Sequence, residues 1–195
     1  VILKALTMKK AGQQFKTVIY GSTKVVAYHK NIISEENIQF NTIEKASEAQ
    51  AGRVNIINCW TDNVNITLGK ANDVGGKCAV DALVAAVKDL KSGEIDALIT
   101  GPINKKAMQL ANFQHIGHTE YLNAEFKAKD SLMLMVSDAL RVGVVTNHLP
   151  LNDVAAAVTQ EKVLRKIMIL AETLKIDFNI DRPTIAVLGL NPHAG

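Results

Sequence analysis

The chain has 195 residues, of which 48% are hydrophobic and 21% charged, which suits a globular protein with a substantial core and one or two domains. Its net charge of +3 comes from dispersed Lys and Arg residues and only 5% of the residues are aromatic, so the composition predicts no nucleic-acid partner. No apolar run approaches the roughly 18 residues of a membrane-spanning helix, and the two cysteines form no disulfide pattern. We therefore expect a cytoplasmic protein without a membrane partner.

Two apolar runs in the first third of the chain are typical of buried strands. Residues 15–20 (FKTVIY) predict a strand, after which Ser22 is placed to cap a helix. Residues 54–60 (VNIINCW) are rich in β-branched side chains and predict a second strand. The region 37–72 is otherwise polar and irregular, and we interpret it as a surface excursion or a sheet edge.

Helical and strand-like patterns alternate along the rest of the chain. Apolar residues at helical spacing predict a helix over 78–90, with Gly93 as its stop. The later predicted elements are a strand at 95–99, helices at 104–110 and from 119, strands at 132–136 and 142–146, a helix over 152–174 with a break allowed near 159–160, and a strand at 185–190. Strands separated by helices indicate βαβ units, and therefore an α/β fold with a mostly parallel sheet.

A turn between a predicted strand and a predicted helix carries the segment Gly101-Pro102-Ile103-Asn104-Lys105. Gly101 allows close approach of a backbone or ligand, and Lys105 could supply a point charge for a phosphate or carboxylate. An ordinary strand-to-helix turn with a solvated lysine explains the same residues and is the favoured interpretation.

Three histidines follow predicted strands or tight turns. His118 stands with Thr119 in Gly-His-Thr-Glu, which fits either a ligand-binding turn or a plain helix start. His148 follows RVGVVT and His193 follows TIAVLGL. Each alone is more often a loop histidine, but together they indicate one cleft with a divalent metal, for which a third protein ligand would be needed.

No Gly-x-Gly-x-x-Gly and no P-loop occurs, so no Rossmann-type NAD site is predicted from motif. Nevertheless, the segments TGPINK, GHTEYL, TNHLPL and LGLNPHAG, in this order, resemble the 4-hydroxythreonine-4-phosphate dehydrogenase family of pyridoxal phosphate biosynthesis. The resemblance implies a three-layer α/β/α fold like that of isocitrate and isopropylmalate dehydrogenases. Residues 1–195 would then be a fragment of a two-domain dehydrogenase, lacking both ends, in which the sequence locates no internal boundary.

The same resemblance implies the site residues and the partners. His118 and Thr119 would bind a small phosphorylated substrate, and His148 and His193 would be two of three metal-binding histidines, the third lying beyond Gly195. The family binds NAD without the Rossmann fingerprint, uses a divalent metal (Zn, Mg or Co), and works as a homodimer with active sites near the subunit interface.

The chemistry implied is the oxidation of 4-phosphohydroxy-L-threonine at carbon 3 by hydride transfer to NAD, with loss of the carboxylate from the β-keto acid. The metal would stabilise the alkoxide and then the enolate. Two alternatives stay open at this point. A related enzyme could oxidise another phosphorylated four-carbon acid, such as erythronate or threonate phosphate. A metal-dependent hydrolase or a non-catalytic metal-binding module would bind no NAD at all.

Overall fold

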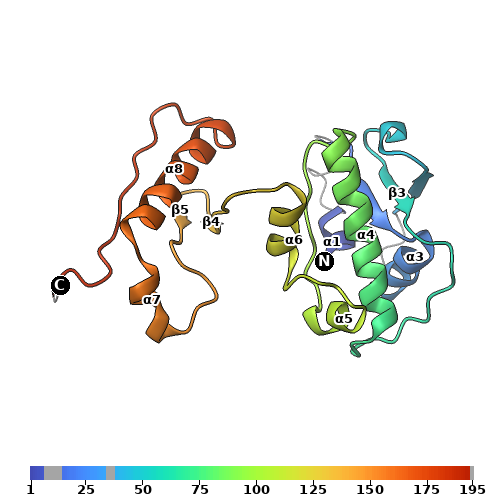
Figure 1. Ribbon diagram of the computed structural model, residues 1–195. Helices are drawn as coiled ribbons and strands as arrows, with labels where there is room; N and C mark the ends of the chain where they lie inside the picture. Colours follow the sequence, from blue (N-terminus) through green and yellow to red (C-terminus); the bar gives the residue numbers. More distant parts are fainter. Residues whose placement is uncertain (7–14, 34–37, 194–195) are drawn as a thin grey trace. The chain divides into compact units, whose positions relative to one another are not determined.

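The computed structural model describes residues 1–6, 15–33 and 38–193 (Figure 1). The chain divides into two compact units, Val1–Leu122 and Asn123–Gly195, each of which is considered by itself. The sequence locates no such boundary. Ala194 and Gly195, which end the LGLNPHAG segment, lie outside the described residues.

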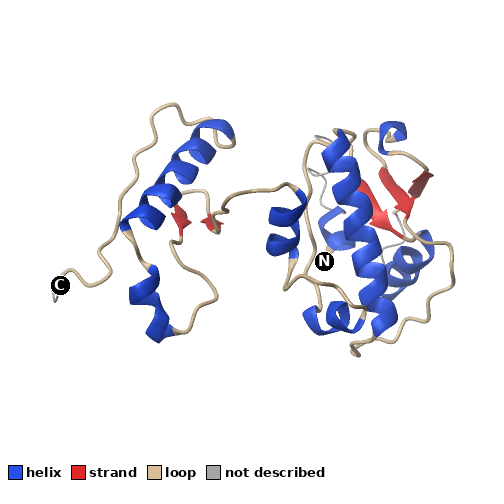
Figure 2. Ribbon diagram, viewed as in Figure 1, coloured by secondary structure: helices blue, strands red, loops and turns tan. Residues whose placement is uncertain are grey.

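A parallel sheet lies at the centre of unit 1. It contains β1 (Val18–Gly21), β3 (Val54–Asn58) and β2 (Phe40–Ile43) in the order β1-β3-β2, with Ile19 paired to Ile56. Figure 2 shows these strands with helices beside them. The predicted strands at 15–20 and 54–60 are confirmed. Strand β2 was not predicted, because Asn41 and Thr42 interrupt a very short run; it lies at the sheet edge that the polar region 37–72 allowed.

Unit 1 contains the helices that the sequence predicts, but the helix predicted over 78–90 begins five residues earlier, at Asp73. They are α1 (Ile2–Leu6), α3 (Thr23–Ile32), α4 (Asp73–Ser92) and α5 (Lys105–Leu110), with a short 3₁₀ helix at Ala46–Glu48 and the start of α6 (His118–Glu125). Helix α4 is capped by Asn72, whose side chain accepts a 2.7 Å hydrogen bond from the Gly75 N–H, and ends at Gly93 in the left-handed conformation (φ 77°). Ser22 stands at the N-cap of α3, as predicted, but its side chain makes no capping bond.

The core of unit 1 forms where α4, α5 and α6 pack together. Leu83, Val87, Met108 and Tyr121 are its buried members, and Met108 is only 2% exposed. The approach of α4 to α5 is very close at Gly76, where an added Cβ atom would lie 1.9 Å from the carbonyl oxygen of Ala107. A glycine is therefore required at this crossing.

A buried asparagine fixes the start of the sheet. The side chain of Asn55 is fully buried in β3 and accepts hydrogen bonds from the Asn41 side chain (2.8 Å) and the Gln50 N–H (3.0 Å). Its amide nitrogen donates to the carbonyls of Thr17 (3.0 Å), Gln50 (3.0 Å) and Arg53 (3.2 Å). One polar side chain thus ties the loop before β3 to the strands on either side.

Unit 2 contains an antiparallel strand pair and two helices. Strands β4 (Leu134–Val136) and β5 (Arg141–Gly143) pair antiparallel, and α7 (Leu151–Ala157) precedes α8 (Gln160–Ile176). The two strands are therefore present but shorter than predicted, and they do not extend the parallel sheet. The break near 159–160 is confirmed, because the Thr159 hydroxyl caps α8 by accepting from the Lys162 N–H at 3.2 Å.

Two predicted strands are wrong. Residues 95–99 and 185–190 run without strand pairing in the part of the chain that the structure describes. Ile99 is 95% exposed and Leu188 is 90% exposed. Apolar and β-branched residues favour a buried strand. The strand also needs a neighbour for its backbone N–H and C=O groups, and the pattern does not show whether one is present.

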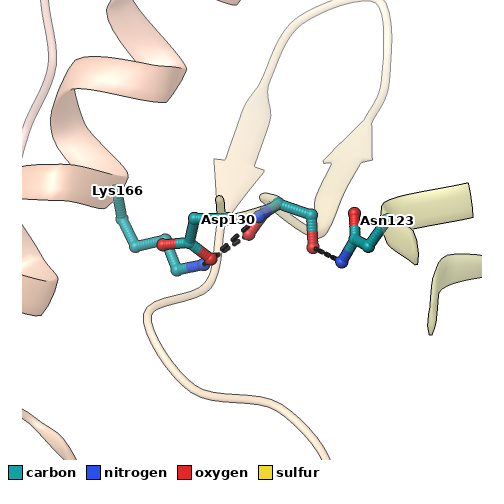
Figure 3. A network of polar contacts seen from close by, with 4 residues as sticks. Asn123, Asp130 and Lys166 are labelled. Atoms are coloured by element: carbon teal, nitrogen blue, oxygen red, sulfur yellow. Dashed lines mark hydrogen bonds and ion pairs between the residues drawn. The ribbon is translucent and has the colours of Figure 1, made fainter. Parts of the chain in front are cut away.

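A network of polar contacts joins three segments of unit 2 (Figure 3). The Lys166 ammonium on α8 donates to the Asp130 carboxylate at 2.6 Å and also to the Ser131 carbonyl. The Asn123 side chain, from the last turn of α6, donates to the Ser131 hydroxyl at 3.1 Å. The hydrogen bond from Lys166 is the main reason that the pKa of Asp130 lies below its usual value.

Candidate functional site

His118 and Thr119 open helix α6 in unit 1. Gly117, which precedes them, is buried and its carbonyl accepts from the Tyr121 N–H at 3.2 Å, closing the first turn of the helix. The His118 side chain is half-buried and that of Thr119 is exposed. Burial lowers the pKa of His118, so the imidazole is neutral near pH 7 and can both donate and accept a hydrogen bond.

The turn that carries this pair rests on an aromatic cluster. The rings of Phe113, His115 and Tyr121 lie 5.3–5.5 Å apart, centroid to centroid. The Phe113 N–H also donates to the Met108 carbonyl at 3.0 Å, which fixes the turn to the end of α5. His115 therefore has a packing role here, and the position of His118 is set by packed neighbours.

Lys105 comes close to the same turn. A Cβ atom added at Gly117 would lie 3.6 Å from Cε and 3.9 Å from Nζ of Lys105, and 3.4 Å from Oε2 of Glu120. The sequence offers Lys105 either as an anion contact or as a solvated lysine, and nothing in it connects the residue to His118. The structure places the lysine head group beside the residue that directly precedes His118.

His148 and His193 lie on exposed loops of unit 2. His148, between β5 and α7, adopts a left-handed backbone conformation with φ 54°, and His193 follows the long loop after α8. Among residues 1–6, 15–33 and 38–193 no group of three or more His, Cys, Asp or Glu side chains could hold a metal ion. Two imidazoles suit Zn²⁺ and similar ions but are an incomplete donor set, so the metal site stays a prediction. The single cleft predicted for all three histidines also stays a prediction, because the two units are described separately.

Unit 1 also contains a cavity of about 650 Å³ that the sequence analysis missed. Gly21 and Ser22 at the end of β1, Trp60 beyond β3, and Cys78 on α4 contribute to its mostly apolar lining. Burial raises the pKa of Cys78, and raises that of Cys59, which follows β3, to about 11, so both cysteines are protonated thiols at neutral pH and neither is an activated nucleophile. Small residues just after a strand were the available sequence signal.

Comparison with known proteins agrees with the motifs. The family model described as pyridoxal phosphate biosynthetic protein PdxA matches residues 13–195. The chain belongs to this family. A 4-hydroxythreonine-4-phosphate dehydrogenase of Bacteroides thetaiotaomicron is 39% identical over 196 residues, covering 100% of this chain and 54% of the relative. One of Sulfurihydrogenibium sp. is 34% identical and covers 100% of this chain and 59% of the relative. The chain thus spans a little over half the length of these relatives.

A relative with a different name and a solved structure also match the chain. A Clostridium botulinum relative, provisionally named D-threonate 4-phosphate dehydrogenase, is 31% identical over 198 residues and matches 100% of this chain and 59% of its own length. The crystal structure of a 4-hydroxythreonine-4-phosphate dehydrogenase from Burkholderia phymatum matches with a TM-score of 0.85 and 30% identity, over 100% of this chain and 59% of that one. The resemblance and the three-layer α/β/α fold class predicted from the sequence are confirmed. No helix in the described ranges is both long and apolar enough to cross a membrane.

Proposed function

We propose that the full-length protein is an NAD-dependent 4-hydroxythreonine-4-phosphate dehydrogenase. It would oxidise and decarboxylate 4-phosphohydroxy-L-threonine to 3-amino-2-oxopropyl phosphate in pyridoxal 5'-phosphate biosynthesis. The observation that carries the proposal is the family match across residues 13–195, together with relatives of that name at 39% and 34% identity.

Within this proposal the described residues bind and orient the substrate. The neutral imidazole of His118 accepts from or donates to a polar substrate group, and the exposed Thr119 hydroxyl supplies a second contact one residue away. NAD would take the hydride. A divalent ion (Zn, Mg or Co) held by His148, His193 and a further ligand would act as a Lewis acid on the substrate oxygen. We further propose that the protein is a cytoplasmic homodimer whose active sites lie near the subunit interface.

The deciding experiment measures NADH formation by the full-length protein. Three substrates are compared at equal concentration: 4-phosphohydroxy-L-threonine, D-erythronate 4-phosphate and D-threonate 4-phosphate. We expect the highest kcat/KM for the first. A preference for D-threonate 4-phosphate would reassign the protein to the activity in the name of its 31% identical relative. Absence of NADH with all three would instead support a hydrolase or a non-catalytic metal-binding module.

The metal assignment has its own test. In the full-length protein, His193→Ala should strongly reduce bound metal, because losing one of three protein ligands leaves an incomplete site. Elemental analysis after dialysis measures this directly, and His29→Ala is the matched control, since His29 lies on α3 far along the chain from the proposed ligands. Equal metal content in wild type and His193→Ala would remove His193 from the site.

Sharing of the active site between subunits is tested by complementation. A His148→Ala protein is mixed with a His118→Ala protein, after each is dissociated and reassociated. Recovery of part of the activity is expected if each site draws on both subunits. A monomer by light scattering at assay concentration, with full activity, would refute a shared site.

A further inference from the structure

The Lys105 side chain folds toward the turn that precedes His118. Its Cε and Nζ atoms lie 3.6 and 3.9 Å from the position that a Cβ atom would take at Gly117. Five residues of α5 and the whole turn 111–116 separate Lys105 from Gly117 in the sequence. The juxtaposition is therefore a product of the fold and not of local sequence.

Packing fixes both ends of this juxtaposition. Lys105 occupies the first position of α5, where the Asn104 side chain caps the helix by accepting from the Ala107 N–H at 3.0 Å. The close contact between Gly76 and Ala107 holds α5 on α4, and buried Met108 locks the next turn. On the other side, the aromatic cluster described above holds the turn before Gly117. The backbone of Lys105 is thus fixed within reach of the turn before the candidate substrate-binding pair.

The Lys105 ammonium is not used by the described part of the protein. It makes no hydrogen bond and no ion pair there, although Glu120 approaches the same point at Gly117. Lys166 in unit 2 offers the contrast, because its ammonium binds both the Asp130 carboxylate and the Ser131 carbonyl. The exposed Lys105 ammonium keeps its donors available to a ligand, next to a turn that already leads to an imidazole and a hydroxyl.

We propose that Lys105 is a further substrate-positioning residue, which binds an oxyanion of the molecule held by His118 and Thr119. The oxyanion is a carboxylate or a phosphate, because an ammonium attracts either as a point charge. The inference rests on the proposed function for the identity of the substrate, and the experiment below separates the two.

Steady-state kinetics of the full-length protein test the proposal with matched variants. Lys105→Ala should raise KM for 4-phosphohydroxy-L-threonine by roughly tenfold or more, since a charge-assisted hydrogen bond is lost on binding. Lys105→Arg, which keeps the charge, should recover most of the affinity. Lys106→Ala removes a neighbouring exposed lysine of the same helix and should leave KM within about twofold of wild type, a change too small to reflect a lost ionic contact. An unchanged KM in Lys105→Ala, or an equal rise in Lys106→Ala, overturns the proposal.

Two further arms identify the anion and exclude a structural role. With 4-hydroxy-L-threonine, which lacks the phosphate, the difference between wild type and Lys105→Ala persists if the carboxylate is bound and disappears if the phosphate is bound. Glu120→Gln removes the nearest carboxylate of α6. If Lys105 serves only to balance Glu120, this variant reproduces the KM rise of Lys105→Ala, and the proposal fails.

The inference can be judged even if the proposed reaction is absent. Should wild type form no NADH with any phosphorylated acid, the proposed function fails, and inorganic phosphate and acetate then serve as the probes in titration calorimetry. Weaker binding of either anion by Lys105→Ala than by Lys106→Ala, at unchanged melting temperature, sustains the anion contact. Equal binding of both anions by the two variants, or no binding of either by wild type, overturns it.

Discussion

In unit 1 the turn that carries His118 and Thr119 rests on a packed core, whereas in unit 2 His148 and His193 lie on exposed loops. Unit 1 buries Ile56, Val87 and Met108 almost completely. In the described part of unit 2, Leu174 is the one hydrophobic residue that is buried. The first pair of candidate residues is therefore pre-positioned by packed neighbours, whereas the second pair lies on exposed loop segments, where His148 has a left-handed backbone conformation.

The largest expected effect comes from a substitution at the crossing of α4 and α5, in the packed core of unit 1. Gly76→Val would place a side chain against the Ala107 carbonyl, which lies 1.9 Å from the position of its Cβ atom. We expect a loss of about 3 kcal/mol or more in the free energy of unfolding, because two packed helices must separate. Urea denaturation measures the loss, and Lys88→Ala, on an exposed position of α4, is the control with an expected change below about 0.5 kcal/mol. A stable Gly76→Val protein would show that the crossing is not as tight as described.

In unit 2 the largest expected loss of stability comes from removing a polar contact, that of Lys166. Lys166→Met should cost about 2 kcal/mol, because the Asp130 carboxylate and the Ser131 carbonyl both lose the ammonium donor in a partly buried place, and Asp130 keeps only the Ser131 N–H among the described residues. Lys175→Met, on the exposed part of α8, is the control. Hydrogen exchange should show faster opening of α8 in Lys166→Met than in the control. Equal protection in both variants would mean that packing alone holds α8.

The contact between Lys166 and Asp130 should also make the stability of the protein depend on pH in the acid range. The folded-state pKa of Asp130 is depressed, so its contribution to stability is present above the ordinary value of 3.8 and is lost as the pH falls through the lower folded value. Wild type should therefore lose more stability than Lys166→Met between pH 5 and pH 2. Parallel stability curves for the two proteins over this range would contradict a role for the pair.

Some helix boundaries could be predicted from the sequence because local signals set them, although the start of α4 was placed five residues too late. The glycine at 93 and the break before α8 are of this kind, since Gly93 tolerates a left-handed backbone and Thr159 caps a helix with its own hydroxyl. Pairing could not be predicted in the same way. Residues 95–99 have the composition of a buried strand, yet strand formation depends on a neighbour that the pattern does not name.

The same distinction applies to the candidate site, where single residues could be identified from motifs but contacts between distant segments could not be predicted. His118 and Thr119 were identified from a short motif, and the structure adds that they open a helix on a packed turn. Lys105 was singled out by the sequence but could not be connected to them, because the contact depends on how α5 lies on α4. The cavity at the end of β1 was missed for a similar reason, since its lining comes from segments far apart in the sequence.

A smaller effect is expected at His118, where the comparison concerns function more than stability. His118→Ala should lower kcat/KM of the full-length protein by at least roughly tenfold, about 1.4 kcal/mol, while the melting temperature changes little because the side chain is only half-buried. Burial lowers the pKa of His118, so activity that requires the neutral imidazole should persist below pH 6.5, the ordinary value for histidine. A large fall in melting temperature with normal kinetics would indicate a structural role instead.

The smallest expected effect concerns the backbone conformation of His148, tested separately from the loss of its imidazole. His148→Ala and His148→Gly both remove the proposed metal ligand, but alanine keeps a Cβ atom at φ 54°, where the left-handed conformation costs about 1–2 kcal/mol for most residues. Glycine adopts this conformation freely but loses more entropy on folding, so we expect His148→Gly to be more stable than His148→Ala by about 1 kcal/mol in urea unfolding. The same pair of substitutions at Leu149, the next residue and one without a positive φ, is the control and should favour alanine. If His148→Ala is the more stable of its pair, the loop does not hold position 148 in the left-handed conformation, and the backbone does not fix the direction of the His148 side chain.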